Sequence, residues 1–188
     1  TSGEYICEAI ELSKLSGQPV KLTWSREDSM SHDYFREGGF CRLRGAMTKD
    51  GKLAAWEEHT IGTAVNGKPS RWTGVHPSTF PIATSAHARG SLTTYPMDTP
   101  SGPWRAPFSN THAFVSQCFI NELAEAGGRD HVELLIEMMG EPRWLEPKTF
   151  RAMNTERAIG VIKLAAEKGG WGRACLLYTS PSPRDKSS

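Results

Sequence analysis

The segment Thr99–Asn110 is a proline-rich turn that leads directly into an apolar run at Ala113–Ala126. Its three prolines fix the backbone φ angle, so the turn presents its side chains and amides with little conformational freedom. At the start of a helix, unpaired backbone N–H groups and the positive end of the helix dipole favour anions. The segment therefore predicts either a site for an anionic cofactor or substrate, or an ordinary helix start.

Helices are indicated by apolar residues that recur at helical spacing and by capping residues at the ends of those runs. The helices expected on these grounds are 4–15, 113–126, 131–139 and 155–168. Asp130 and Asn154 are the expected N-caps of the last two, because short polar side chains accept hydrogen bonds from the first free N–H groups. Ser25 is expected to cap a polar turn or short helix. Gly17 and Gly169 are expected to end the first and last helices.

Strands are indicated where apolar and polar residues alternate. They are expected at 20–24, 40–47 and 53–62, with strand and turn at 95–105. The pair Asp50-Gly51 lies between two of these runs and is a strong hairpin signal. Residues 63–84 carry no such pattern, which makes them either a functional loop or a segment that covers a partner. The elements fit one core, or equally a piece of a larger domain.

The end of the chain looks foreign to the sequence before it. Residues 175–188 follow a glycine-rich stretch, Gly169–Gly172, and have no helical or strand periodicity. The string Cys175–Asp185 equals the translation of one reading frame of a common transposase-type sequencing adapter. We therefore expect residues 1–174 to be native and residues 175–188 to be an adapter-derived tail, with an ordinary Ser/Pro-rich tail as the alternative.

Charge and cysteine content exclude several classes of protein. Without the tail the chain holds 20 basic and 20 acidic residues, a balance that gives no reason to expect a nucleic-acid partner. No run of about 18 apolar residues is present, so no membrane helix is expected. The remaining cysteines (Cys7, Cys41 and Cys118) suit neither a disulfide framework nor a metal site, and are expected to be buried or half-buried. No pair of histidines has metal-ligand spacing. Glu57 and Glu58 are adjacent on a strand and face opposite ways, so they form no acid–base pair.

Three ordered stretches carry a resemblance to a known family. The first joins 8–14 to 18–28, the second joins 39–45 to 50–53 and Trp56, and the third joins Gly-Pro-Trp-Arg-Ala-Pro-Phe-Ser-Asn at 102–110 to 113–114 and 119–124. In this order they resemble the large, molybdopterin-binding subunit of the xanthine dehydrogenase/aldehyde oxidase family, above all the isoquinoline 1-oxidoreductase beta-subunit type. The resemblance covers essentially all of residues 1–174.

The resemblance implies an α+β fold, a fragment of the molybdopterin-binding domain of a molybdenum hydroxylase with helices packed on short mixed or antiparallel sheets. Such enzymes oxidise an aldehyde or an N-heterocycle with water as the oxygen source and pass electrons to iron–sulfur clusters. The implied cofactor is molybdenum-molybdopterin in its cytosine dinucleotide form. The implied partners are a small iron–sulfur subunit, a cytochrome c subunit and a small-molecule substrate. The location is left open between cytoplasm and periplasm.

By position, the resemblance assigns the loop 104–110 to the segment that lies beside the cofactor. Backbone N–H groups of Arg105 and Ala106, with Pro107 in the same loop, would then bind the cofactor. The side chain of Trp104 or Phe108 would line the substrate-binding site. Relatives usually carry a glycine where this chain has Phe108, and a phenylalanine there requires either room or a displaced backbone.

Arg36 could match an arginine that polarises substrate in some relatives, or it could be a surface arginine paired with Asp33 or Glu37. The family's glycine-rich molybdenum-binding loop would lie before Thr1, and its base glutamate beyond Ala174. The resemblance therefore implies an internal fragment that is inactive alone and contains neither a catalytic residue nor a metal ligand.

Two other functions remain open. One is a non-catalytic binding module or degraded paralogue of the same fold, which the phenylalanine at 108 motivates. The other is a hydrolase, which requires a serine within hydrogen-bond reach of a histidine.

Overall fold

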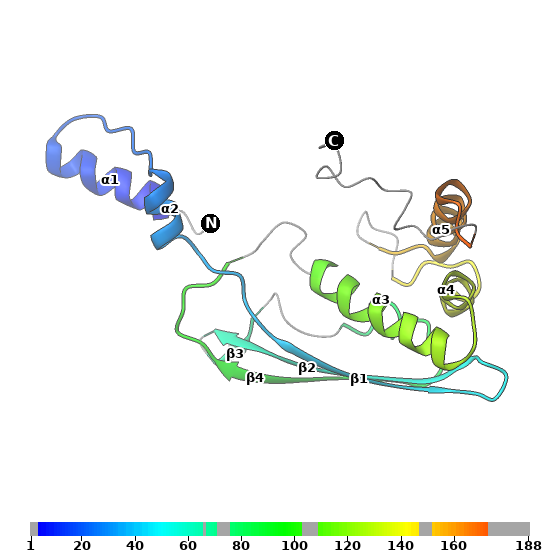
Figure 1. Ribbon diagram of the computed structural model, residues 1–188. Helices are drawn as coiled ribbons and strands as arrows, with labels where there is room; N and C mark the ends of the chain where they lie inside the picture. Colours follow the sequence, from blue (N-terminus) through cyan, green and yellow to red (C-terminus); the bar gives the residue numbers. More distant parts are fainter. Residues whose placement is uncertain (1–3, 66, 71–75, 103–108, 147–151, 173–188) are drawn as a thin grey trace, which may run out of the picture. The chain divides into compact units, whose positions relative to one another are not determined.

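The computed structural model describes residues 4–65, 67–70, 76–102, 109–146 and 152–172 (Figure 1). Its helices are α1 (Glu4–Ser16), α2 (Arg26–His32), α3 (Ser109–Ala126), α4 (His131–Met139) and α5 (Thr155–Gly169). Its strands are β1 (Phe40–Met47), β2 (Leu53–Val65), β3 (Lys68–Pro69) and β4 (Ala88–Pro96). The fold is α+β: the strands form one four-stranded sheet in which β1, β3 and β4 all pair with β2.

The chain forms two compact units. Unit 1 contains Thr1–Phe40, Thr60–Gly74 and Leu92–Asn110, and unit 2 contains Cys41–His59, Val75–Ser91 and Thr111–Ser188. The boundaries between units fall within β1, β2, β4 and α3 and between residues 74 and 75.

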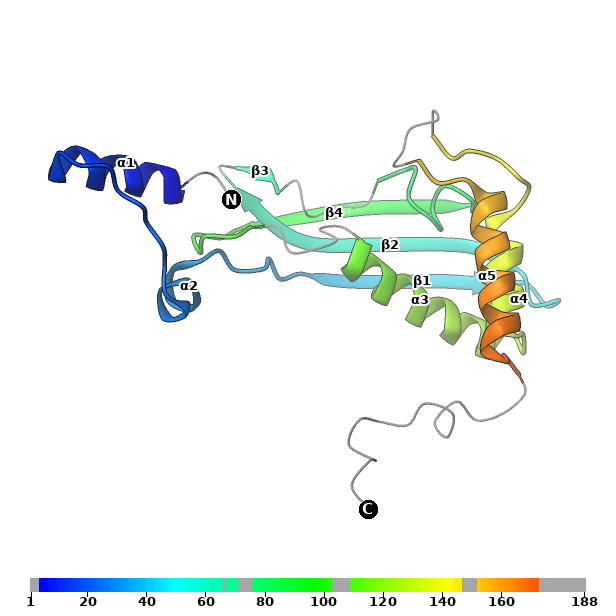
Figure 2. The same cartoon turned by 90° about the horizontal axis from the view of Figure 1, so that it is seen from above.

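The apolar core of unit 2 lies between its part of the sheet and helices α3 and α4. The indole of Trp56 meets the ring of Phe119 edge-on, with 5.2 Å between ring centroids. Each fully buried Leu or Ile contributes about 1.5–3 kcal/mol of apolar transfer free energy. Helix α4 also packs against α5, and the two lie side by side in Figure 2. The buried apolar residues are Trp56, Ile120, Leu123, Ala124, Leu134, Leu135, Met138 and Met139.

The hairpin between β1 and β2 confirms the turn predicted at Asp50-Gly51. Gly51 adopts φ +73°, its N–H donates to the Thr48 carbonyl at 3.0 Å, and the Thr48 N–H donates to the Lys52 carbonyl at 2.8 Å. A Cβ at position 51 would lie 2.9 Å from the Gly127 carbonyl oxygen. Glycine is therefore required by the left-handed backbone and also by the close approach of the turn that ends α3.

The predicted short helix after Ser25 is confirmed as α2. The Ser25 hydroxyl accepts from the Asp28 N–H, and the Asp28 carboxylate accepts from the Ser25 N–H, so both halves of a capping box are present. The strand predicted at 20–24 is wrong, because these residues pair with no strand of the described chain. Trp24 packs instead on α1, where its Nε1–H donates to Glu8 at 2.8 Å and its ring meets Tyr5 edge-on.

The long patternless region and the strand after it differ most from the sequence-based expectations. β2 continues to Val65 and turns back into β3, with Ala64 opposite Pro69, where a loop was predicted. β4 begins at Ala88 and ends at Pro96, so only the first two residues of the strand and turn predicted at 95–105 are strand, and residues 103–105 lie outside the described residues. The sequence of β4, ARGSLTTYP, is polar and hardly alternates, because much of the strand is exposed on both faces.

The remaining predictions mostly hold. Helices α1, α3, α4 and α5 all form, and α3 begins four residues earlier than predicted. The C-cap of α5 is Gly170, with φ +67°, and not Gly169. Cys7 and Cys118 are exposed and only Cys41 is half-buried, so burial was wrongly predicted for two of the three. None of the helices in the described ranges combines the length and the apolarity needed to cross a membrane.

Candidate functional site

Five of the six residues that the sequence assigns to the site lie in 103–108, outside the described residues. They are Trp104, Arg105, Ala106, Pro107 and Phe108. The structure does describe the residues before this loop, which belong to unit 1, and helix α3 after it, which belongs to unit 2 from Thr111 onward.

The upstream flank is held to residues 34–37 by a short two-stranded ladder. The Phe35 N–H donates to the Pro100 carbonyl at 3.0 Å, and the Gly102 N–H donates to the Phe35 carbonyl at 3.0 Å. A Cβ on Gly102 would lie 2.9 Å from the Cβ of Tyr34. A glycine therefore allows the chain to pass closely over Tyr34 just before the loop begins.

The carboxylate of Glu37 ties the same flank to the sheet. Its Oε2 accepts a hydrogen bond from the Thr63 hydroxyl at 2.8 Å. Its Oε1 accepts from the Ser70 hydroxyl at 2.7 Å and from the Ser101 hydroxyl at 3.0 Å. Thr63 is fully buried and Ser70 is 5% exposed, so their hydroxyls need a protein partner. Three hydroxyl donors satisfy the carboxylate without a buried cation.

Sequence reasoning missed this role of Glu37 and considered it only as a surface partner of Arg36. The three donors lie 26, 33 and 64 residues away along the chain, and no local pattern links residues so distant. Arg36 itself is half-buried on the same segment. Nothing in its surroundings tests the substrate-binding role, which stays a prediction.

The downstream flank begins with α3, whose first turn carries no acidic residue. Within unit 2, His112 lies close to Glu58 on the buried face of β2. Their nearest atoms, His112 Nδ1 and Glu58 Oε1, are 3.5 Å apart, and the two side chains are 19% and 4% exposed. This Oε1 has no hydrogen-bond partner among the described residues. Among the described residues, His112 is therefore the nearest side chain recorded as a partner for this buried oxygen of Glu58.

Glu57 lies on the opposite face of the same strand, as the sequence predicted for two adjacent residues. It is paired with Arg44, with 3.7 Å between Arg44 Nη1 and Glu57 Oε2. The two carboxylates therefore have different partners and form no acid–base pair.

The contact required of a hydrolase exists between Ser78 and His76, but the arrangement is not catalytic. The Ser78 hydroxyl donates to Glu146, and the Ser78 N–H donates to His76 Nδ1 at 3.3 Å. In a catalytic triad the histidine stands between the serine and the carboxylate and uses both ring nitrogens. Here serine and glutamate both meet the Nδ1 side of an imidazole that is 72% exposed. The cluster is a hydrogen-bonded turn.

Metal ligation by side chains has no candidate in the described ranges. No group of three or more His, Cys, Asp or Glu residues there is arranged to hold a metal ion.

Comparison with known proteins gives one family and two relatives. The sequence matches the family described as "Molybdopterin cofactor-binding domain" over residues 3–137. It is 25% identical over 199 aligned residues to the membrane-bound aldehyde dehydrogenase (pyrroloquinoline-quinone) of Gluconacetobacter polyoxogenes. The aligned region covers 93% of this chain and 25% of that protein. It is 24% identical over 172 residues to the isoquinoline 1-oxidoreductase subunit beta of Brevundimonas diminuta, which covers 89% of this chain and 21% of that subunit. The chain thus spans a quarter or less of the length of these relatives.

Proposed function

This chain belongs to the family of molybdopterin cofactor-binding domains, and we propose that it forms one wall of the cofactor site in a molybdenum hydroxylase. When bound, the cofactor supplies the redox chemistry by which an aldehyde or an N-heterocycle gains an oxygen atom from water. The backbone N–H groups of Arg105 and Ala106 would hold the cofactor, with Pro107 restricting their conformation. Trp104 and Phe108 would wall the substrate, and Arg36 would bind it.

The observation that carries this proposal is the anchoring of the chain immediately before the loop. Glu37 holds Ser101 by a hydrogen bond of 3.0 Å, and the Gly102 N–H is bonded to Phe35 at 3.0 Å. A loop that must offer backbone donors to a ligand benefits from such fixed ends, since a preorganised loop loses less entropy on binding.

The downstream flank also suits an anionic cofactor. Because α3 has no acidic residue in its first turn, the positive end of its dipole is not neutralised there by a side chain of its own. The described residues offer no competing side-chain metal site. Both features agree with a metal that is carried by its own organic ligand, with the protein supplying position and hydrogen bonds.

Three finer features belong to the same proposal. The cofactor is of the cytosine dinucleotide form, electrons leave to iron–sulfur clusters on a small partner subunit, and a cytochrome c subunit is a further partner. The catalytic base lies outside this sequence, so the 188-residue chain alone is inactive. The name of one relative as a subunit beta supports a multi-subunit enzyme.

The test uses the longer protein that contains this chain, expressed where a known molybdenum enzyme is loaded. Ala106→Pro removes the proposed backbone donor, and Ala106→Ser keeps it and is the matched control. We expect molybdenum and pterin to bind the parent and the serine variant in equal amounts, and the proline variant to lose most of both. Equal cofactor content in all three would contradict the donor role. A parent that binds neither molybdenum nor pterin would favour the non-catalytic binding module.

A further inference from the structure

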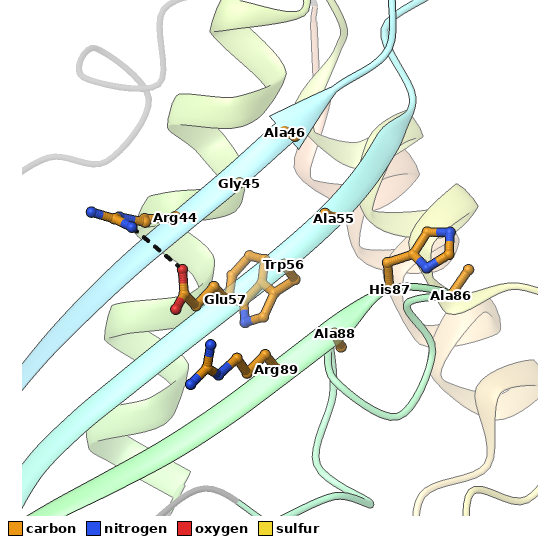
Figure 3. Close-up of a pocket in the computed structure, with 10 residues that line it drawn as sticks. All are labelled: Arg44, Gly45, Ala46, Ala55, Trp56, Glu57, Ala86, His87, Ala88 and Arg89. Atoms are coloured by element: carbon orange, nitrogen blue, oxygen red, sulfur yellow. Dashed lines mark ion pairs between the residues drawn. The ribbon is translucent and has the colours of Figure 1, made fainter.

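The face of the sheet turned away from α3 carries a group of arginines in unit 2. Leu43, Trp56 and Glu58 point toward the core or are buried, and side chains alternate along a strand, so their neighbours point the other way. Figure 3 shows Arg44, Glu57 and Arg89 on three adjacent strands of this face. We call the following set the arginine face: Arg42 and Arg44 on β1, Glu57 and His59 on β2, and Arg89 and Ser91 on β4.

The charges on the arginine face are not balanced. Glu57 is its one carboxylate, and it pairs with Arg44 at 3.7 Å, where the two side chains are 37% and 63% exposed. Arg42 and Arg89 have no ion-pair partner in the described part of the chain. Two guanidinium groups are therefore left without counter-charges, and both present planar donor pairs that match a carboxylate.

A hollow with a floor of small residues adjoins the arginines. It has a volume of about 600 Å³ and is lined by Arg44, Glu57 and Arg89, by Trp56 and His87, and by the small residues Gly45, Ala46, Ala55, Ala86 and Ala88. A second space of about 320 Å³ lies among Arg42, Arg44, Glu57, His59, Arg89 and Ser91. Because the two share three residues, they form one continuous depression across the strands.

The shape and lining of this depression favour a protein segment as its occupant. Small-molecule sites enclose most of their ligand, whereas this hollow is wide open to solvent. Arginines around an apolar strip are typical of protein interfaces, in which arginine is enriched. The excess positive charge further requires that the occupant be acidic.

We propose that the arginine face is a docking surface for an acidic segment of a partner protein. Carboxylates of that segment pair with Arg42 and Arg89, and small side chains between them lie over the alanine floor of the hollow. The carboxylate of Glu57 repels the carboxylates of the segment and so limits the affinity of the arginine face for it. The proposal does not depend on cofactor binding, because the charged side chains that it uses, those of Arg42, Glu57 and Arg89, lie on the face away from α3.

The test measures binding of a fluorescein-labelled peptide of alternating glutamate and alanine to the longer protein that contains this chain, by fluorescence anisotropy. An exposed charge pair contributes about 0.2–1 kcal/mol, so we expect the double variant Arg42→Gln/Arg89→Gln, which removes two such pairs, to raise Kd by about two- to thirtyfold. Glu57→Gln is expected to lower Kd by about twofold on the same basis. Arg157→Gln, which removes an exposed arginine from α5, is the matched control and should leave Kd unchanged.

Three results would overturn the proposal. The first is a Kd that changes no more in the double variant than in Arg157→Gln. The second is a Kd that rises in Glu57→Gln. The third is complete displacement of the peptide by inorganic phosphate at matched ionic strength, which would identify the depression as a site for small oxyanions.

Discussion

The carboxylate of Glu58 lies 3.5 Å from the imidazole of His112, on the buried face of β2 and under the early part of α3. The Glu58 side chain is 4% exposed, and its Oε1 accepts no hydrogen bond from the described residues. Burying a carboxylate oxygen without a polar partner is costly, so the nearby imidazole is the group that offsets this cost at Oε1. The contact therefore couples the strand that carries Glu58 to the helix that comes after the proposed cofactor loop.

We predict that Glu58 and His112 are energetically coupled. His112→Ala should lower the free energy of unfolding by about 1–3 kcal/mol, since it leaves the Glu58 carboxylate without its partner. In the background of Glu58→Gln the same change should cost less, with a coupling of about 0.5–3 kcal/mol. Urea denaturation of the two single variants and the double variant measures this difference.

Glu57→Gln provides the control for that cycle. Glu57 is adjacent to Glu58 in sequence but pairs with Arg44 on the other face of the sheet. Its substitution should therefore be additive with His112→Ala. If the Glu57 cycle showed the same coupling as the Glu58 cycle, the effect would be one of general charge and not of the contact.

We predict that Glu37→Ala loosens the flank that precedes the cofactor loop. The substitution leaves three hydroxyls without their acceptor, two of them buried, and should cost about 1–3 kcal/mol of stability. Hydrogen exchange should accelerate at the Gly102 amide, because the ladder to Phe35 loses its support. Glu11→Ala on α1 is the matched exposed control. Unchanged exchange at Gly102 in the Glu37 variant would show that the ladder holds by itself.

We predict that Gly51→Ala destabilises more than Gly67→Ala. Both glycines have nearly the same left-handed backbone, with φ +73° and +72°. A Cβ at 51 would meet the Gly127 carbonyl at 2.9 Å, whereas at 67 nothing lies within 4 Å. Backbone strain destabilises both variants by about 1–2 kcal/mol. Only Gly51→Ala also forces a clash, with the Gly127 carbonyl oxygen. Thermal unfolding compares them, and equal losses would mean that the turn at 51 moves aside at no cost.

We predict that Asp130 makes part of the stability of the chain depend on pH in acid. The Trp171 Nε1–H donates to the Asp130 carboxylate at 2.8 Å, and this hydrogen bond, with that of the Glu133 N–H, lowers the pKa of Asp130 below its ordinary value of 3.8. A carboxylate whose pKa is lowered by folding stabilises the folded state fully above its unfolded pKa. That contribution is then lost as the pH falls through the folded pKa.

Asp130→Asn keeps an N-cap for α4 but removes the charge. It should therefore be less stable than the parent at neutral pH, and the difference should shrink as the pH falls below about 4. Trp171→Phe, which removes the main cause of the shift, should reduce the same pH dependence. A difference between parent and Asp130→Asn that stays constant down to acid pH would contradict this assignment.

Short sequence patterns were enough to predict the helix caps and turns that form between residues close together in the chain. Ser25, Asp130 and Asn154 cap helices through bonds to residues three positions away, so their spacing in the sequence contains the information. The turn at Gly51 is equally local. β4 could not be predicted in this way, because it pairs with β2, which is distant in sequence; the bond from the Trp56 N–H to the carbonyl of His87, just before β4, joins residues 31 positions apart.

The residues of the candidate site show the same difference between local and distant causes. The loop at 103–108 was predicted from its motif, whereas the role of Glu37 was not, since its donors at Thr63, Ser70 and Ser101 come together only in the folded chain. The arginine face was missed for the same reason. Each arginine is an ordinary polar residue on its own strand, and the cluster forms only when β1, β2 and β4 are placed side by side.

The final prediction concerns Phe108, at a position where the family resemblance implies a glycine. If the loop binds the cofactor in the longer protein, Phe108→Gly should restore the backbone freedom of that position and raise molybdenum content, or leave it unchanged if the ring already has room. Phe108→Trp adds bulk and is expected to lower molybdenum content below that of the parent. Metal analysis and pterin fluorescence of the three purified proteins measure this order. A glycine variant that binds less molybdenum than the parent would show that the phenylalanine itself contributes to the site, and the comparison with glycine-bearing relatives would then not apply to this chain.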